Sequence, residues 1–160
     1  MPWADAVYGC DGPWWKSRNG LPDFHGLKLA HDTSVCIAYR DVHKIEVVDH
    51  DQMLFDEPGV VGSGGNSGFQ AINLAVQFGA RRILLAGFDM HGAGGVHWYG
   101  RNRWKDATNP DDVRYVRWRK VLGVQAKVLA RMGIEVVNVS PSSALTCFPH
   151  QPLDQALIGI

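Results

Sequence analysis

The stretch VVGSGGNSGFQ, residues 60–70, combines the residue types that bind phosphate groups in proteins. Its glycines precede an apolar pattern with helical spacing, and Asn66 and Ser67 stand where that helix would begin. Successive glycines let backbone N–H groups approach a ligand, and the amino end of a helix adds partial positive charge. The sequence therefore predicts that an anionic group binds at Gly65, Asn66, Ser67 and Gly68.

A structural role for the same stretch is the alternative. Asn66 or Ser67 would then only cap the helix, and the glycines would form a flexible connection. The stretch is not a Walker motif, because no Gly-Lys-Ser/Thr follows, and it is not a GxGxxG motif after a first strand. Both interpretations stay open from spacing alone.

Two aspartates follow strand-like segments. Asp11 follows the segment DAVYGC, and Asp89 follows RILLAGF. Ligands of parallel sheets bind beyond the carboxyl ends of the strands, so either carboxylate could hold a ribose hydroxyl or a metal. Hydrogen bonding to loop backbone is the alternative for both. Asp89 is also a candidate catalytic residue, and Ser143, which follows a third strand-like segment, is a candidate nucleotide contact.

Segment 91–109 is long for a connection and is predicted to be an active-site lid or a binding loop. Within it, Trp98 could stack on a base, and the cations at positions 101–105 could meet phosphate. His97 is a candidate general acid or base, because histidine changes its charge near neutral pH. The alternative is a loop that packs its aromatic side chains onto the core.

No metal site is predicted from the remaining histidines, acids and cysteines. The histidines and aspartates at positions 31–32, 43 and 49–51 match no known ligand spacing, so they are expected on the solvated surface. The three cysteines are unclustered and fit a reducing cytoplasm. Magnesium could still accompany a bound nucleotide.

Composition narrows the class of protein. A chain of 160 residues is expected to form a single domain, residues 1–160, and its 46% hydrophobic fraction is that of a globular protein. Lys+Arg and Asp+Glu both number 16, so general nucleic-acid binding is not indicated. There is no apolar run long enough for a membrane span and no signal-peptide pattern at the start.

A repeated order of helix, glycine and strand predicts an α/β fold with a mostly parallel sheet. The first repeat is a helix reaching Phe78, then Gly79, then the strand RILLAG. The second is a helix capped at Asn109, then Gly133, then the strand IEVVNV. The basic residues of this second helix, at positions 114–120, are expected to face water. Further predicted elements are the strand DAVYGC, a helical turn PWWKSR, the strand candidates LKLA, VCIAY and IEVV, and a last helix near Pro152.

The whole chain resembles a family of phage and prophage proteins with a Rossmann-like fold. That family is related to archaeal 6-hydroxymethylpterin diphosphokinase and, more remotely, to bacterial lipo-oligosaccharide sialyltransferases. The resemblance rests on the order and spacing of Pro2-Trp3-Ala4-Asp5, Tyr8, Asp11, Trp14-Trp15, Asn66-Ser67-Gly68 through Leu74-Ala75, Ile83 through Asp89-Met90, His97-Trp98, Asn138-Val139-Ser140-Pro141, Ser143-Ala144-Leu145 and Phe148-Pro149.

The resemblance implies a three-layer Rossmann-like fold and a nucleotide or nucleotide sugar as partner, in the cytoplasm of a bacterial host. In the sialyltransferases the nucleotide lies against the segments similar to Asp11, Ser67-Gly68 and the stretch after Asp89. The function that follows is nucleotide binding, with transfer of a glycosyl or diphosphate group as the activity of an enzyme of this kind. A non-catalytic binding module is the alternative.

The chain departs from the family pattern in two ways. Family members begin with a strand and a Gly-x-Gly-Pro-Ser loop, followed by a second strand, whereas this sequence starts after both. An N-terminally truncated fragment is therefore a third interpretation. The strand DAVYGC would become an open sheet edge, which predicts a homodimer through that edge. The catalytic histidine of the sialyltransferases would fall at positions 116–118, where this chain has Val-Arg-Trp.

Overall fold

The computed structural model describes residues 3–97, 100–103 and 109–158. These residues form a mixed α/β protein in which every pair of strands is parallel, as the sequence predicts. The elements, in chain order, are β1 (Ala6–Gly9), α1 (Gly12–Ser17), β2 (Leu27–Ala30), α2 (Thr33–Ala38), β3 (Val42–Lys44), β4 (Glu46–Val48), β5 (Val60–Gly62), α3 (Ser67–Gln77), β6 (Arg82–Leu85), α4 (Asp112–Arg131), β7 (Glu135–Asn138) and α5 (Leu153–Ala156).

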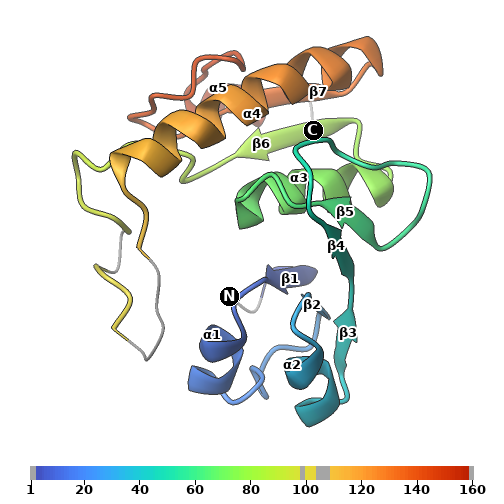
Figure 1. Cartoon of the computed structure of the whole chain (residues 1–160). Coiled ribbons are helices and arrows are strands. Elements are labelled where there is room, and N and C mark those ends of the chain that lie inside the picture. The colour runs from blue at the N-terminus through green and yellow to red at the C-terminus, as the bar shows by residue number, and fades with distance from the viewer. Residues whose placement is uncertain (1–2, 98–99, 104–108, 159–160) are drawn as a thin grey trace.

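The described strands form three short pieces with the orders β1-β2-β3, β4-β5 and β6-β7 (Figure 1). The first two pieces are joined by the chain itself, because only Ile45 separates β3 from β4. Its amide donates to Ala30 O (2.9 Å), and the next amide, of Glu46, donates to Gly59 O (2.8 Å). One extended segment therefore pairs with β2 and then with β5. A single continuous sheet in a three-layer Rossmann-like arrangement stays a prediction.

Helix α3 is the central element of the fold. It lies between the β4–β5 pair and β6 in Figure 1. Phe69 and Ile72 pack into the largest apolar cluster, together with side chains of α4, β6 and β7. Leu74 packs into a second cluster with side chains of β2 and β5. A helix with apolar contacts on two faces is typically buried. Packing on both faces orients α3, and this sets the direction in which its amino end points.

Caps and glycines set the helix ends, largely as predicted. Asn66 caps α3, its side-chain Oδ1 accepting from the amide of Phe69 at 3.1 Å. Gly79 and Gly133 follow α3 and α4 with φ of +91° and +71°, the left-handed conformation that favours glycine. The predicted cap of α4 at Asn109 is wrong. Asp111 is the cap instead, accepting from the amide of Arg114 at 2.8 Å.

The predicted strand VCIAY is also wrong, since these residues belong to helix α2 and its end. The carboxylate of Asp32 accepts from the amides of Ser34 (2.7 Å) and Val35 (3.2 Å) and so caps the helix. Of this stretch only Val35 is fully buried, which suits one side of a short helix. Strands β3 and β5 were not predicted, because each has only three residues and too few positions to show alternation.

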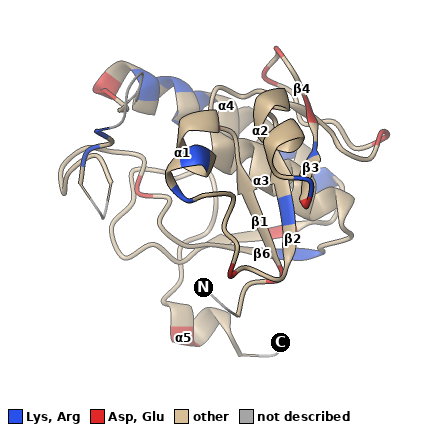
Figure 2. Cartoon of the chain, turned by 90° about the horizontal axis from the view of Figure 1, so that it is seen from below, with Lys and Arg blue, Asp and Glu red and all other residues tan. Residues whose placement is uncertain are grey.

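The charged surface is mixed in sign. In the view of Figure 2, Lys and Arg residues are scattered among Asp and Glu residues over the helices and loops. The basic residues of α4 at positions 114, 117 and 120 are exposed, as the sequence predicts, and Arg117 Nη1 also donates to Gly64 O (3.2 Å). Arg119 is the exception, since it is half-buried and its Nη1 donates to Met90 O (2.6 Å). Among the described helices, none is long and apolar enough to cross a membrane.

Candidate functional site

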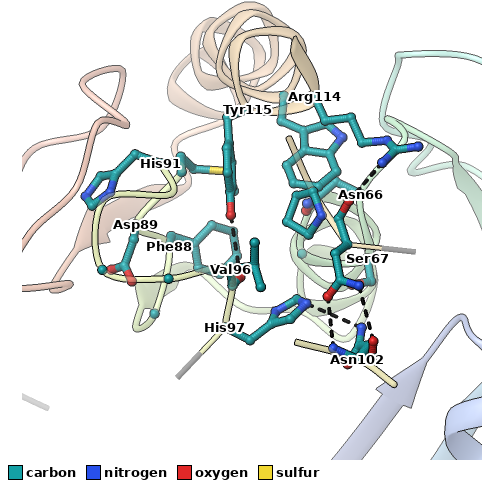
Figure 3. A pocket seen from close by; sticks show the side chains of 18 of the residues that line it. Asn66, Ser67, Phe88, Asp89, His91, Val96, His97, Asn102, Arg114 and Tyr115 are labelled. Atoms are coloured by element: carbon teal, nitrogen blue, oxygen red, sulfur yellow. Dashed lines mark hydrogen bonds between the residues drawn. The ribbon is translucent and has the colours of Figure 1, made fainter. Parts of the chain in front are cut away.

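A cavity of about 940 Å³ opens at the carboxyl ends of β1 and β6 (Figure 3). Its wall comes from five places: the residues after β1, the loop leading into α3, the segment after β6, the first turns of α4, and Ser142 in the loop after β7. The volume is that of a site for a small molecule or cofactor. In Figure 3, Asp89 and His91 lie on one side, and Asn66 and Ser67 lie on the other.

The amino end of α3 forms one wall. Asn66 satisfies the amide of Phe69, while the amides of Ser67 and Gly68 have no acceptor among the described residues. Gly68 packs closely: a Cβ there would lie 2.8 Å from Phe88 Cζ and 2.8 Å from Asn66 Oδ1. Two unsatisfied donors and the helix dipole together make this wall suited to an anionic group.

The loop before α3 is held in place from α4. Gly64 and Gly65 have φ of +53° and +64°. The guanidinium of Arg117 donates to Gly64 O and, through Nη2, to Asp51 Oδ1 at 2.7 Å. A Cβ on Gly65 would lie 2.1 Å from Arg117 Nη1, and the positive φ at this position favours glycine. The loop is thus joined to α4 by a hydrogen bond from an arginine that also pairs with Asp51.

Cys10 and Asp11 lie next to this wall. Burial, and then the charge of Asp11, raise the pKa of the Cys10 thiol to about 11, whereas a hydrogen bond with Ser67 acts in the opposite direction. The thiol thus contacts both Ser67 and Asp11, and it is protonated at neutral pH. Asp11 stands at the N-cap position of α1, but its side chain makes no capping hydrogen bond, so its carboxylate is not committed to that helix.

His97 belongs to the segment after β6 and lies between the two walls in Figure 3. Its Nε2 is 3.3 Å from Asn102 Nδ2, as Figure 3 shows. Burial lowers the pKa of His97, while the negative charge of Asp11 opposes that effect. A lowered pKa keeps the imidazole neutral at pH 7, so the side chain can accept a proton from a bound ligand.

The segment after β6 forms the opposite wall. The carboxylate of Asp89 is exposed, and its backbone carbonyl accepts from the amide of Ala144 at 2.8 Å. His91 Nε2 lies 3.2 Å from Ser142 Oγ. Met90, with φ of +55°, turns the chain between them and is anchored through its carbonyl by Arg119.

Aromatic side chains cover the cavity from the side of α4. The rings of Tyr115 and Trp118 meet edge to face at 5.6 Å, and Tyr115 Oη lies 3.5 Å from Val96 O. Burial is the main cause that raises the pKa of Tyr115, so its hydroxyl is a donor at neutral pH. Aromatic surface next to an anion-binding helix end suits a ligand with a planar ring and a phosphate.

Most of the predicted site residues meet at this cavity. Those that line it are Asp11, Gly65, Asn66, Ser67, Gly68, Asp89 and His97. Ser143 is not among the residues that line the cavity. Its hydroxyl donates to Phe88 O (2.6 Å) and accepts from Asn138 Nδ2 (2.8 Å), whereas the neighbouring Ser142 lines the cavity. Trp98 lies outside the described residues.

The lining residues that sequence reasoning missed are those of α4, namely Arg114, Tyr115 and Trp118. Cys10, Phe88, His91, Asn102 and Ser142 also line the cavity, and they lie in segments predicted at the strand ends or in the predicted loop 91–109, although they were not singled out as site residues. Tyr115 and Trp118 were predicted only as part of the buried stripe of α4, because core and cavity wall have the same helical spacing. The position of Arg114 one turn from the helix start, beside Tyr115, was the available signal.

The described residues contain no group of three His, Cys, Asp or Glu side chains placed to hold a metal ion.

The fold and the cavity define an α/β protein with parallel strands and a small-molecule-sized site at the carboxyl ends of two of them. Comparison of the chain with family models, with curated proteins and with solved structures finds no match.

Proposed function

We propose that this protein binds a nucleotide or nucleotide sugar in the cavity between α3 and α4. The observation that carries the proposal is the convergence, in one cavity, of two amides without acceptors at the start of α3 and the aromatic pair Tyr115–Trp118. The phosphate would accept from Ser67 and Gly68, and the base would lie against the aromatic side chains.

The family resemblance of the sequence supports the same function. It implies a nucleotide against Asp11, Ser67-Gly68 and the stretch after Asp89, and these segments line one cavity. It also implies a phage or prophage protein acting in the cytoplasm of a bacterial host, and this remains part of the proposal.

Transfer of a glycosyl or diphosphate group is the activity that this site could support. His97 lines the cavity, and burial lowers its pKa, which favours the neutral imidazole that a base toward an acceptor hydroxyl requires. Asp89, with its exposed carboxylate, is the second candidate. A binding module without catalysis needs neither. An enzyme would release the nucleotide from a nucleotide sugar, and His97→Gln should abolish this release while binding persists. A binding module would bind the nucleotide sugar without releasing the nucleotide.

Calorimetric titration tests the binding proposal. The purified chain is titrated with CMP, CTP, ATP, GTP and nucleotide sugars, with and without magnesium. Saturable binding of at least one of these ligands is expected. Absence of binding at millimolar concentration contradicts the proposal.

A proline substitution isolates the predicted phosphate contact. Ser67 is the first residue of α3, where proline is well tolerated, and Asn66 before it is extended, with φ −152° and ψ 128°. Ser67→Pro removes one donor amide that has no acceptor in the described structure, whereas the control Ser67→Ala removes only the hydroxyl. We expect Ser67→Pro to weaken binding by about 10-fold or more, since a hydrogen bond to a charged group contributes about 1.5–3 kcal/mol. Equal affinities of the two variants would contradict a phosphate at this amide.

We also propose that two copies pair through β1. The strand is at the end of its sheet and is paired only with β2 among the described strands, and Trp3 beside it is 77% exposed. Because the carbonyl of Asp5 accepts from the amide of Leu27, the amide of Val7 faces β2 and that of Ala6 faces the free edge. Sedimentation velocity of the wild type and of Ala6→Pro, which removes an edge-facing donor, tests this pairing. A dimer that Ala6→Pro dissociates is expected, and a monomer at high concentration contradicts it.

A further inference from the structure

The anion-binding wall of the cavity carries a carboxylate of its own. Cys10 contacts both Ser67 and Asp11, so Asp11 lies within a few side-chain lengths of the amides that face the cavity. The charge of Asp11 also acts on Tyr8 and on His97. The negative charge of Asp11 therefore acts on three side chains, those of Tyr8, Cys10 and His97. The carboxylate itself is exposed and makes no capping hydrogen bond.

The described wall offers little positive charge to balance it. Two carboxylates, Asp11 and Asp89, line the cavity, against one guanidinium, that of Arg114. Arg117 is close to the loop but is bound by Asp51 and by Gly64 O. Sites that hold triphosphates usually supply a lysine or several arginines to the outer phosphates. The described part of this wall has no lysine.

We propose that Asp11 is a specificity-determining residue that makes the site select nucleotides with a single phosphate and reject free triphosphates. The inference rests on the proposed nucleotide-binding function. One phosphate can be satisfied by the amides of Ser67 and Gly68 and by the helix dipole. Each further phosphate adds negative charge beside Asp11, and the Arg114 guanidinium is the one side-chain cation that the described wall offers to it.

Electrostatics gives the expected size of the effect. Two unit charges about 7 Å apart, in a medium between bulk water and a protein surface, repel enough to change affinity by roughly 3- to 8-fold. A triphosphate carries about two more charges than a monophosphate, so a preference of about 10-fold or more is expected at low salt. The preference shrinks as salt rises, because an exposed carboxylate is screened.

A different role for Asp11 gives a different result. If Asp11 only accepts from a ribose hydroxyl, its loss weakens all phosphorylation states of one nucleoside equally. If it repels outer phosphates, its loss changes the ratio between them. The ratio of affinities is therefore the measurement that separates the two roles.

Calorimetry with CMP, CDP and CTP in the presence of EDTA, at about 20 mM and 200 mM salt, tests the proposal. The wild type is expected to bind in the order CMP, CDP, CTP, with the ratio of CMP to CTP affinities falling at the higher salt. Asp11→Asn is expected to reduce that ratio by about 10-fold at the lower salt. Asp154→Asn, which makes the same charge change on α5 far from the cavity lining, is expected to leave the ratio unchanged.

Each outcome decides a different claim. CTP binding as tightly as CMP in the wild type overturns the selectivity while leaving nucleotide binding intact. A ratio that Asp11→Asn does not change assigns the selectivity to another group and overturns the role of Asp11. Absence of binding by all three ligands overturns the proposed function, and the inference with it.

Discussion

The two walls of the cavity differ in the hydrogen bonds that hold them. The wall at the start of α3 is fixed on every side: Asn66 caps the helix, Arg117 holds Gly64 O, and Gln70 Nε2 donates to Ser63 O at 2.8 Å. Gln70 in turn accepts from Tyr8 Oη at 2.5 Å, so the loop is tied to β1 as well. This wall is shaped before any ligand arrives.

The wall after β6 is held at its start, where the amide of Ala144 and the guanidinium of Arg119 donate to the carbonyls of Asp89 and Met90. Beyond Met90, the side-chain contacts that join residues 91–97 to other elements include His91 with Ser142 at 3.2 Å and Val96 O with Tyr115 at 3.5 Å. Gly94, in its middle, has open space where a Cβ would stand. Under the proposed function, the α3 wall would set the position of the phosphate, and the wall after β6 would contact the rest of the ligand.

The largest expected effect is a contrast between two glycine-to-alanine substitutions. In Gly64→Ala the Cβ would lie 2.4 Å from the buried ring of Phe69, on a residue with φ +53°. Left-handed backbone costs a non-glycine residue about 1–2 kcal/mol and overpacking about 1–3 kcal/mol, so a loss of about 2–5 kcal/mol is expected. Gly94→Ala meets no atom within 4 Å and should change stability by less than about 0.5 kcal/mol. Urea denaturation of both variants measures the contrast, and equal stabilities would remove the distinction between the walls.

The reactivity of Cys10 gives a smaller effect at the fixed wall. The pKa of its thiol is raised from the ordinary 9.0 to about 11, so at pH 8 its thiolate fraction is about 100-fold below that of an ordinary cysteine. The higher intrinsic nucleophilicity of a high-pKa thiolate offsets about half of this on a logarithmic scale, which leaves alkylation about 10-fold slower. Mass spectrometry of iodoacetamide labelling against time measures the rate, and labelling as fast as in a short peptide would contradict the burial of this thiol.

The same shift fixes the sign of a pH effect on stability. The folded protein favours the protonated thiol of Cys10, so this contribution is fully present below about pH 9 and is lost as the pH rises toward 11. Replacing Cys10 by serine, whose hydroxyl does not titrate in this range, should flatten the fall in unfolding free energy between these two pH values. An unchanged slope would show that other groups cause it.

The smallest expected effect is at the helix cap. Asn66→Ala removes the side-chain acceptor for the amide of Phe69 and should lower the free energy of unfolding by about 1 kcal/mol. Asn66→Ser keeps an acceptor at this position and should recover most of that loss. Thermal unfolding of the two variants measures the difference. If Asn66→Ala leaves the free energy of unfolding unchanged, the hydrogen bonds from Arg117 and Gln70 hold this wall without the cap.

The fixed wall is also the part of the molecule that the sequence predicted best. Its signals are local: a cap at Asn66, a helix of uniform period, and Gly79 after it lie within 14 consecutive positions. The fold class followed from the repeat of helix, glycine and strand. The helix α2 was mistaken for a strand because Val35, Cys36 and Ile37 favour strands by type, and only the capping geometry of Asp32 decides against it.

The rest of the site depends on contacts between distant segments. Arg117 reaches Gly64 across 53 positions of the chain, and Ser140 Oγ accepts from the amide of Phe88 across 52. No spacing rule within one helix distinguishes an arginine that faces water from one that holds a loop. The cap at Asp111 was misplaced by two residues, since Asn109 and Asp111 have equal propensity for that position and tertiary packing selects one.

The most direct test of a nucleotide at the α3 wall is a titration followed by two-dimensional ¹H–¹⁵N NMR. On addition of CMP, the amides of Ser67 and Gly68 should show the largest shifts, while Gly79 and Gly133, which end α3 and α4 away from the cavity, should stay in place. Saturable shifts at the two amides would establish the phosphate contact on which the proposed function depends. Saturable binding that leaves both amides unmoved would contradict it.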